Sequence, residues 1–198
     1  GAAADVSFTC DAAALPPVEG LRRLTMTQYQ NSVHDLMTWA LGDAALGTKV
    51  MSELGTALAD VPSDVREAVP QDLHGSYRRL DQSLQQEHVD AIYAVGVAAG
   101  AALSAPDRLE HVAGSCATDA DASNDDTCLT AFIQRFGSRV LRHPLDADEV
   151  DFYRSIYGTD AKADPAAYAD VIGVLLNAPE FVYFVASTRL SRWSRVNS

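Results

Sequence analysis

Apolar residues recur at intervals of three and four along most of this chain, which is the spacing of one face of an α-helix. The segment after Thr25 shows this best, because its apolar residues share one face up to Gly42, which can end a helix. Those residues are Tyr29, Val33, Leu36, Met37 and Ala40. Similar patterns predict helices over residues 80–103 and 127–141. Since no long alternating strand pattern interrupts them, the sequence predicts an all-α fold, an irregular bundle of about five or six helices.

Residues typical of helix ends mark several boundaries. Three pairs do so: Thr25 with Gln28, Asp146 with Glu149, and Asp164 with Pro165. The first two have the form of capping boxes, and the third is an N-cap followed by proline at the first helical position. We expect residues 177–179 to end one helix and start the next. The predicted organisation is an N-terminal extension over 1–19, a helical domain over 20–186 and a basic tail over 187–198.

The charge of the chain argues against several kinds of partner. Its 198 residues include 27 acidic and 15 basic ones, which leaves a formal net charge of −12. Nucleic-acid phosphate and anionic lipid both repel such a chain, so we expect neither as a partner. No apolar run approaches the ~20 residues that cross a bilayer, so we expect no membrane span.

Cys116 and Cys128 bracket a short polar loop, and two interpretations of them are open. If the chain turns between two cysteines so close in sequence, they can form a disulfide. In a reducing cytosol they would instead be two free buried thiols. Cys10 is then left over, either as a free thiol or bonded to another chain.

The loop between these cysteines carries oxygen-bearing side chains on alternate residues. They are Asp119, Asp121, Ser123 and Asp125. Alternating oxygen ligands are how a calcium loop surrounds a hard cation, so calcium is a candidate ligand. However, Asn124 stands where an EF-hand requires glycine, and Thr130 stands where it requires a bidentate glutamate. A solvated loop tied at both ends by the cysteines is the alternative.

His88 and Glu180 are the candidate catalytic residues. His88 lies on the apolar face of the predicted helix 80–103, where a hydrogen-bonded core histidine is the alternative to a functional one. Glu180 lies in the apolar segment 172–185, so we expect partial burial and an arginine partner. That pair would serve either catalysis or a structural Arg–Glu clamp.

Four arginines near predicted helix ends are expected to pair with carboxylates or to cap carbonyls. They are Arg22, Arg23, Arg139 and Arg142. The sequence contains no glycine-rich phosphate loop, no His-Glu-x-x-His and no Gly-x-Ser-x-Gly motif. No established catalytic motif therefore assigns a reaction to the chain.

Three stretches of the chain, taken in order, match a known set of motifs. Residues 21–25 with 29–36 match RRLT…Y.NTVRDL, residues 132–150 match FRRPLT..E, and residues 174–183 match L.SPEFLYR.E. On these motifs the chain resembles large planctomycete-type proteins found alongside extracytoplasmic cytochromes. The resemblance covers most of residues 20–186 and ends where Ala186 replaces the usual acidic residue.

The resemblance implies an exported protein, in the periplasm or outside the cell. The N-terminus lacks the basic and apolar regions of a signal peptide, as expected once a signal has been removed. Members of the family are several times longer, so we expect this chain to be one piece of a longer polypeptide. Their later modules carry a Cys-x-x-Cys-His site for c-type haem, which this sequence lacks.

We therefore expect no cofactor attached to this chain, with haem on the remaining C-terminal part of the precursor or on a separate chain. The chain would be the N-terminal helical part of a redox protein, packing on the haem-bearing part and contributing an aromatic residue such as Trp39 or Tyr183. Two other hypotheses remain open. One is a subunit of an exported enzyme, such as an oxidoreductase, whose site is shared between two chains. The other is a surface structural or binding module with calcium in its acidic loop.

Overall fold

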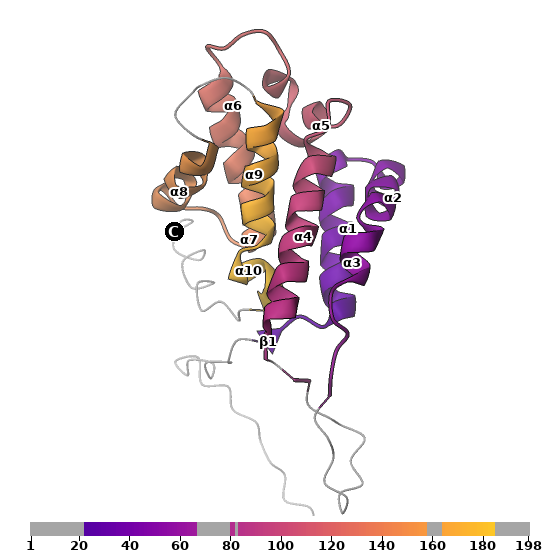
Figure 1. The fold of residues 1–198 in the computed structure, drawn as a ribbon. Helices are drawn as coiled ribbons and strands as arrows, with labels where there is room; N and C mark the ends of the chain where they lie inside the picture. Colours follow the sequence, from indigo (N-terminus) through magenta and orange to yellow (C-terminus); the bar gives the residue numbers. More distant parts are fainter. Residues whose placement is uncertain (1–21, 67–79, 82, 158–163, 185–198) are drawn as a thin grey trace, which may run out of the picture. The chain divides into compact units, whose positions relative to one another are not determined.

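The computed structural model describes residues 22–66, 80–81, 83–157 and 164–184, and it shows a mostly helical fold (Figure 1). The longer helices are α1 (Met26–Leu41), α2 (Ala44–Glu53), α4 (Gln86–Leu103), α8 (Ala147–Tyr157) and α9 (Pro165–Leu176). The shorter ones are α3 (Gly55–Ala59), α5 (Leu109–Ala113), α6 (Asp125–Phe132), α7 (Ser138–Leu141) and α10 (Pro179–Val182). The other elements are a 3₁₀ turn (Ser115–Ala117), a π-helical turn (Ile133–Gly137) between α6 and α7, and the strands β1 (Arg22–Arg23) and β2 (Tyr183–Phe184). The prediction of an irregular all-α bundle is confirmed.

The predicted helix caps are present. Thr25 Oγ1 accepts a hydrogen bond from the Gln28 backbone N–H at 3.1 Å, and Gln28 Oε1 accepts one from the Thr25 N–H at 2.9 Å. Gly42 ends α1 in the left-handed conformation, with φ of 63°. Asp146 and Glu149 form the second reciprocal pair, and Asp164 caps α9 through the Ala166 N–H at 2.9 Å. Local side-chain chemistry therefore sets these boundaries.

Two predicted helices begin elsewhere. The helix expected from residue 80 starts at Gln86, because Leu80 pairs with Arg66 in a β-bridge and Asp81 Oδ1 accepts the Ser83 N–H at 2.8 Å. The helix expected from residue 127 starts at Asp125 and contains the π-helical turn. The proposed extension 1–19, the tail 187–198 and Cys10 lie outside the described residues.

α4 lies beside α9, and α2 packs on α1 (Figure 1). Small residues allow α4 and α9 to approach closely. A Cβ placed on Gly100 would lie 2.3 Å from the backbone oxygen of Ala169, and one on Gly96 would lie 3.0 Å from that of Gly173. Side chains larger than hydrogen do not fit at these two positions of α4 unless the helices move apart.

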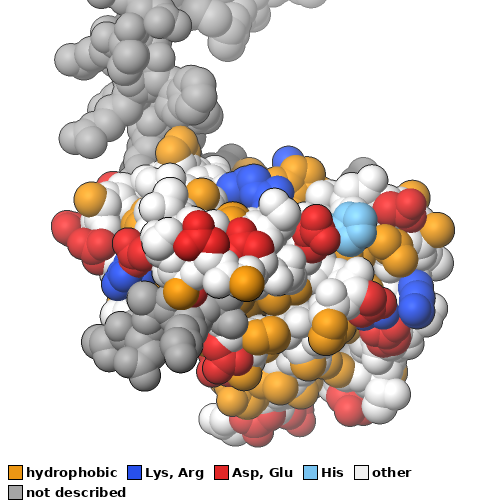
Figure 2. Space-filling model, turned by 90° about the horizontal axis from the view of Figure 1, so that it is seen from above, with side chains coloured by type: hydrophobic (Ala, Val, Ile, Leu, Met, Phe, Trp, Pro, Cys, Tyr) orange, Lys and Arg blue, Asp and Glu red, His pale blue; other side chains and the backbone are white. Residues whose placement is uncertain are grey.

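Acidic side chains spread over the end of the structure where α5 and α6 lie. Figure 2 looks down on this end and shows Asp and Glu side chains across it, with hydrophobic side chains between them. This distribution agrees with the net charge of −12. Among the described helices, none is both long enough and apolar enough to cross a membrane.

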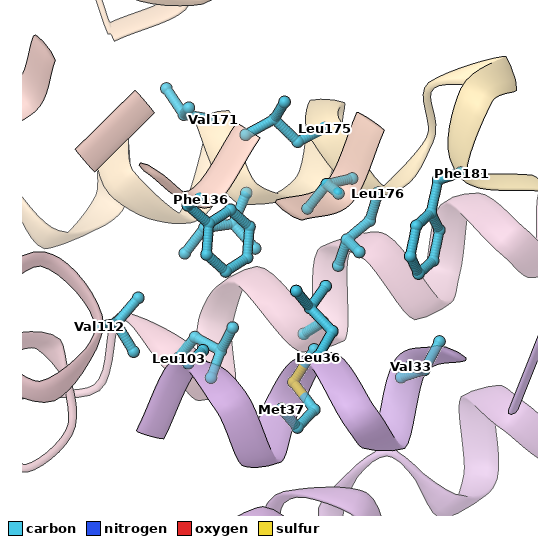
Figure 3. Packing of buried hydrophobic residues seen from close by; sticks show 14 of the residues in the cluster. Val33, Leu36, Met37, Leu103, Val112, Phe136, Val171, Leu175, Leu176 and Phe181 are labelled. Carbon is cyan, nitrogen blue, oxygen red and sulfur yellow. The ribbon is translucent and has the colours of Figure 1, made fainter. Parts of the chain in front are cut away.

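The hydrophobic core draws on most of the described helices (Figure 3). Its fully buried members include Val33 and Met37 of α1, Leu103 of α4, Phe136 of the π-helical turn, and Leu175 and Leu176 of α9. Phe132 stacks on Phe136 with ring centroids 5.3 Å apart and meets Tyr168 edge-on at 5.2 Å. Such aromatic contacts add to the stabilisation from buried apolar area.

A two-stranded antiparallel sheet joins the start and the end of the described unit. Arg22 pairs with Phe184 and Arg23 with Tyr183, and the Leu24 N–H donates to the Val182 oxygen at 3.0 Å. The sequence did not predict these strands, because two residues are too short to show alternation.

Candidate functional site

Cys116 and Cys128 form a disulfide with an S–S distance of 2.05 Å and Cα atoms 5.9 Å apart. The bond joins the 3₁₀ turn to α6 and closes the acidic loop, and Cys128 is buried. The disulfide prediction is therefore confirmed, and the alternative of two free thiols is wrong. Disulfides of this kind persist in oxidising compartments.

The candidate calcium ligands use their oxygens within the loop. Asp119 accepts from the Asp121 N–H at 2.9 Å and from Asn124 Nδ2 at 3.0 Å. Asp121 Oδ1 accepts from the Ser123 N–H at 3.0 Å and from Ser123 Oγ at 2.6 Å, and these hydrogen bonds lower the pKa of Asp121. Asp125 is buried in the first turn of α6. Within the described residues, no three acidic, histidine or cysteine side chains converge as a metal site requires.

His88 is buried at the start of α4, where it is 9% exposed. Its Nδ1 accepts a hydrogen bond from the Gln85 backbone N–H at 3.4 Å, which closes the cap of the helix. The structure thus places His88 as a hydrogen-bonded core histidine, the alternative that its apolar surroundings suggested.

Glu180 is exposed, so the expectation that it is partly buried is wrong. It lies in the first turn of α10, whose buried side chains are the next two, Phe181 and Val182. The expected arginine is present but contacts the backbone: Arg142 donates to the Glu180 and Phe181 oxygens rather than to the carboxylate. No hydrogen bond or ion pair of the described residues joins Glu180 to His88.

A groove of about 500 Å³ lies between α1, the end of α7 and α10. Its polar lining consists of Ser32, Asp35, Ser138, Arg139, Arg142 and His143. Arg142 ends α7 with φ of 61°, the left-handed conformation, which is uncommon for a residue with a side chain. Its guanidinium also lies 5.7 Å from the Phe181 ring centroid, and partial burial lowers its pKa. Arg142 thereby holds α10 against the end of α7.

Two further arginines, Arg135 and Arg139, lie over the Trp39 ring beside this groove. The guanidinium carbons of Arg135 and Arg139 lie 5.8 and 5.6 Å from the centroid of the Trp39 ring, within the range of a cation–π interaction. Arg135 also donates to the Val112 oxygen. Of the four arginines expected to pair or cap, Arg23 does pair, with Asp64 at 3.2 Å, whereas Arg139 stacks on an aromatic ring.

The most buried arginine of the described residues, Arg108, forms an ion pair that the sequence did not predict. Arg108 is 4% exposed and donates to both carboxylate oxygens of Glu53, at 2.7 and 2.6 Å, and to the Ala102 oxygen at 3.0 Å. The hydrogen bond from Arg108 lowers the pKa of Glu53. The partners lie 55 residues apart, so no local pattern could have joined them.

One face of α4 exposes apolar side chains. Val89, Tyr93 and Val97, spaced four residues apart on the helix, are 50%, 62% and 50% exposed, and we call them the α4 stripe. No charged residue occurs in α4 after Asp90. On the adjacent helix α9, Val174 is also exposed. A contiguous apolar helix face on a surface is typical of a site that contacts another protein segment.

The residues of this chain do not fit covalent attachment of haem. That attachment requires two closely spaced thiols followed by histidine, whereas Cys116 and Cys128 are 12 residues apart and bonded to each other. This chain therefore lacks the motif through which c-type haem is covalently attached.

A family model matches residues 128–185. The family, PSD5, is described as a protein of unknown function (DUF1595). The matched segment begins at the second disulfide cysteine and contains all of the second and third stretches on which the sequence resemblance rests. No curated protein and no solved structure shows a significant similarity to the chain. From Cys128 to the end of β2, the chain is thus similar to a family whose function is not established.

Proposed function

We propose that this chain is the N-terminal helical part of an exported redox protein and packs on a segment or partner chain that carries c-type haem. In this role it is a scaffold. The motif resemblance to proteins found alongside extracytoplasmic cytochromes supports the redox context, and the family match at residues 128–185 supports the placement of two of the motifs. The disulfide supports export.

The observation that carries the packing role is the α4 stripe. Val89, Tyr93 and Val97 leave an apolar face uncovered on the helix that also packs against α9. Covering such side chains stabilises an interface by about 25 cal/mol per Å² of apolar area removed from water. A tyrosine at the centre of the stripe suits an interface, because its ring is large and its hydroxyl tolerates water.

The candidate catalytic residues support a scaffold more than an enzyme. His88 is occupied in the cap of α4, and Glu180 is exposed without a described partner for its carboxylate. Neither the shared-site enzyme nor the calcium-bound module has a specific observation in its favour. The chain is therefore a scaffold in this proposal.

A tagged form of the chain, expressed in its native source, tests this proposal. We expect it to recover a haem-bearing polypeptide, visible by its absorption, and we expect Tyr93→Arg to reduce the recovery at least tenfold. Val65→Ser is the matched control, because Val65 is an exposed apolar residue outside the stripe and is 62% exposed. Equal recovery with Tyr93→Arg and with the control would contradict a role for the stripe.

A further inference from the structure

The groove between α1, α7 and α10 brings together the three stretches that carry the family resemblance. Asp35 and Leu36 come from the first stretch, Arg142 from the second and Phe181 from the third. These residues are far apart in sequence, and only the fold makes them neighbours. Each of the three stretches therefore contributes residues to the lining of the groove, and the α4 stripe contributes none.

Two arginines that line the groove, Arg139 and Arg142, have no carboxylate partner among the described residues. The buried and half-buried arginines do have such a partner: Arg23 has Asp64, Arg108 has Glu53 and Arg154 has Asp126. Arg139, which is exposed, instead stacks on Trp39, and Arg142 contacts backbone oxygens and the Phe181 ring. In a protein with 27 acidic residues, this pairing pattern leaves a local cationic surface for an external anion.

Three hydrogen-bond donors in the groove have no acceptor among the described residues. They are the Arg139 guanidinium and the hydroxyls of Ser32 and Ser138, both half-buried. His143 does not add to them, because its Nδ1 contacts the Pro144 oxygen at 2.9 Å and its Nε2 lies 3.6 Å from Glu149. Asp35, the one acid of the lining, is 76% exposed, so water screens its charge.

The rest of the lining is apolar and consists of Leu36, Pro144 and Phe181. A volume of about 500 Å³ lies within the range of small-molecule sites. We propose that this groove binds an organic monocarboxylate, whose carboxylate meets Arg139 and the two serine hydroxyls and whose apolar body lies against Leu36 and Phe181. A guanidinium fork and hydroxyl donors match the two oxygens of a carboxylate.

Within this site the arginines have different roles. Arg139 is the residue that contacts the ligand, and Trp39 holds its guanidinium in place through the cation–π contact at 5.6 Å. Arg142 is a positioning residue, because its hydrogen bonds to the α10 backbone set the distance between Phe181 and the end of α7. The proposal does not depend on a haem-bearing partner and can fail or hold without it.

Titration of the full chain with benzoate, followed by nuclear magnetic resonance or calorimetry, tests the site. We expect saturable binding of benzoate, and at least tenfold weaker binding of benzamide, its uncharged analogue. Inorganic phosphate should also bind at least tenfold more weakly, because it has no apolar body. Benzamide or phosphate binding as tightly as benzoate, or benzoate failing to saturate, would overturn the proposal.

Two matched variants locate the binding. Arg139→Gln should weaken benzoate binding at least tenfold, whereas Arg135→Gln should leave it within twofold, because Arg135 shares Trp39 but does not line the groove. Ser32→Ala provides a second variant with little risk to folding and should weaken binding about threefold. Equal losses for Arg135→Gln and Arg139→Gln, or unchanged binding in both Arg139→Gln and Ser32→Ala, would refute a site in this groove.

Discussion

Replacing Gly100 with alanine tests the contact between α4 and α9. A Cβ at this position would lie 2.3 Å from the Ala169 backbone oxygen, 3.1 Å from its carbonyl carbon and 3.3 Å from its Cα. All three atoms belong to the backbone, so no side-chain rotation can relieve the clash. The helices must move apart or the bundle must bend.

The size of the effect follows from that distance. Ordinary contacts of a Cβ begin near 3.4 Å, so the backbones must separate by about 1.1 Å, which is 3.4 less 2.3. Overpacking that moves the backbone costs about 1–3 kcal/mol, and displacing a whole helix lies at the upper end. Alanine recovers about 1 kcal/mol over glycine inside a helix. We therefore expect Gly100→Ala to lower the free energy of unfolding by about 2 kcal/mol.

Urea unfolding followed by circular dichroism measures this change, and Tm should fall by about 4–8 °C for a protein of this size. Gly55→Ala is the matched control, because a Cβ at Gly55 meets nothing within 4 Å. That variant should leave stability unchanged or raise it by up to about 1 kcal/mol. If Gly100→Ala were as stable as the control, the close approach of α4 and α9 would be refuted.

Three further predictions concern buried polar groups and the disulfide. Burial raises the pKa of Tyr29, so the folded state resists ionisation of this side chain. The free energy of unfolding should therefore fall by up to about 1.4 kcal/mol per pH unit above pH ~10. Tyr29→Phe should make this fall with pH less steep in unfolding curves recorded at alkaline pH. Glu53→Ala should lower the free energy of unfolding in urea more than Arg108→Met. Glu53→Ala leaves a buried guanidinium without its main counter-ion, whereas Arg108→Met leaves a carboxylate that water reaches. A larger loss of stability for Arg108→Met would contradict this reasoning. Cys116 and Cys128 should resist alkylation until reduced, and replacing both with serine should cost about 3 kcal/mol in the same assay; labelling of the native, unreduced protein would show that the bond does not form.

Elements whose signals lie within a few residues could be predicted from the sequence. The capping box of Thr25 and the stop at Gly42 define α1, and the cap at Asp164 defines the start of α9. The disulfide also belongs to this group, because its cysteines flank one loop. These features depend on local chemistry that the tertiary structure leaves unchanged.

Features that depend on distant residues could not be predicted. α4 starts at Gln86 and not at residue 80, because Leu80 pairs with Arg66 in a β-bridge. No helical pattern in the sequence reveals that pairing. Burial of Glu180 was predicted from its apolar neighbours, but only the packing of α10 decides which side chain of a short turn faces outward. The groove around Arg139 likewise exists only once three distant stretches meet.

The most direct test of the account is to purify the native polypeptide from its source under mild conditions and to record the mass and the visible absorption of the particle that contains it. The account predicts a particle heavier than the 21.2 kDa chain, with the absorption of c-type haem carried by a covalently linked or tightly bound second part. A colourless particle containing this chain alone, and able to perform its activity without haem, would contradict the account.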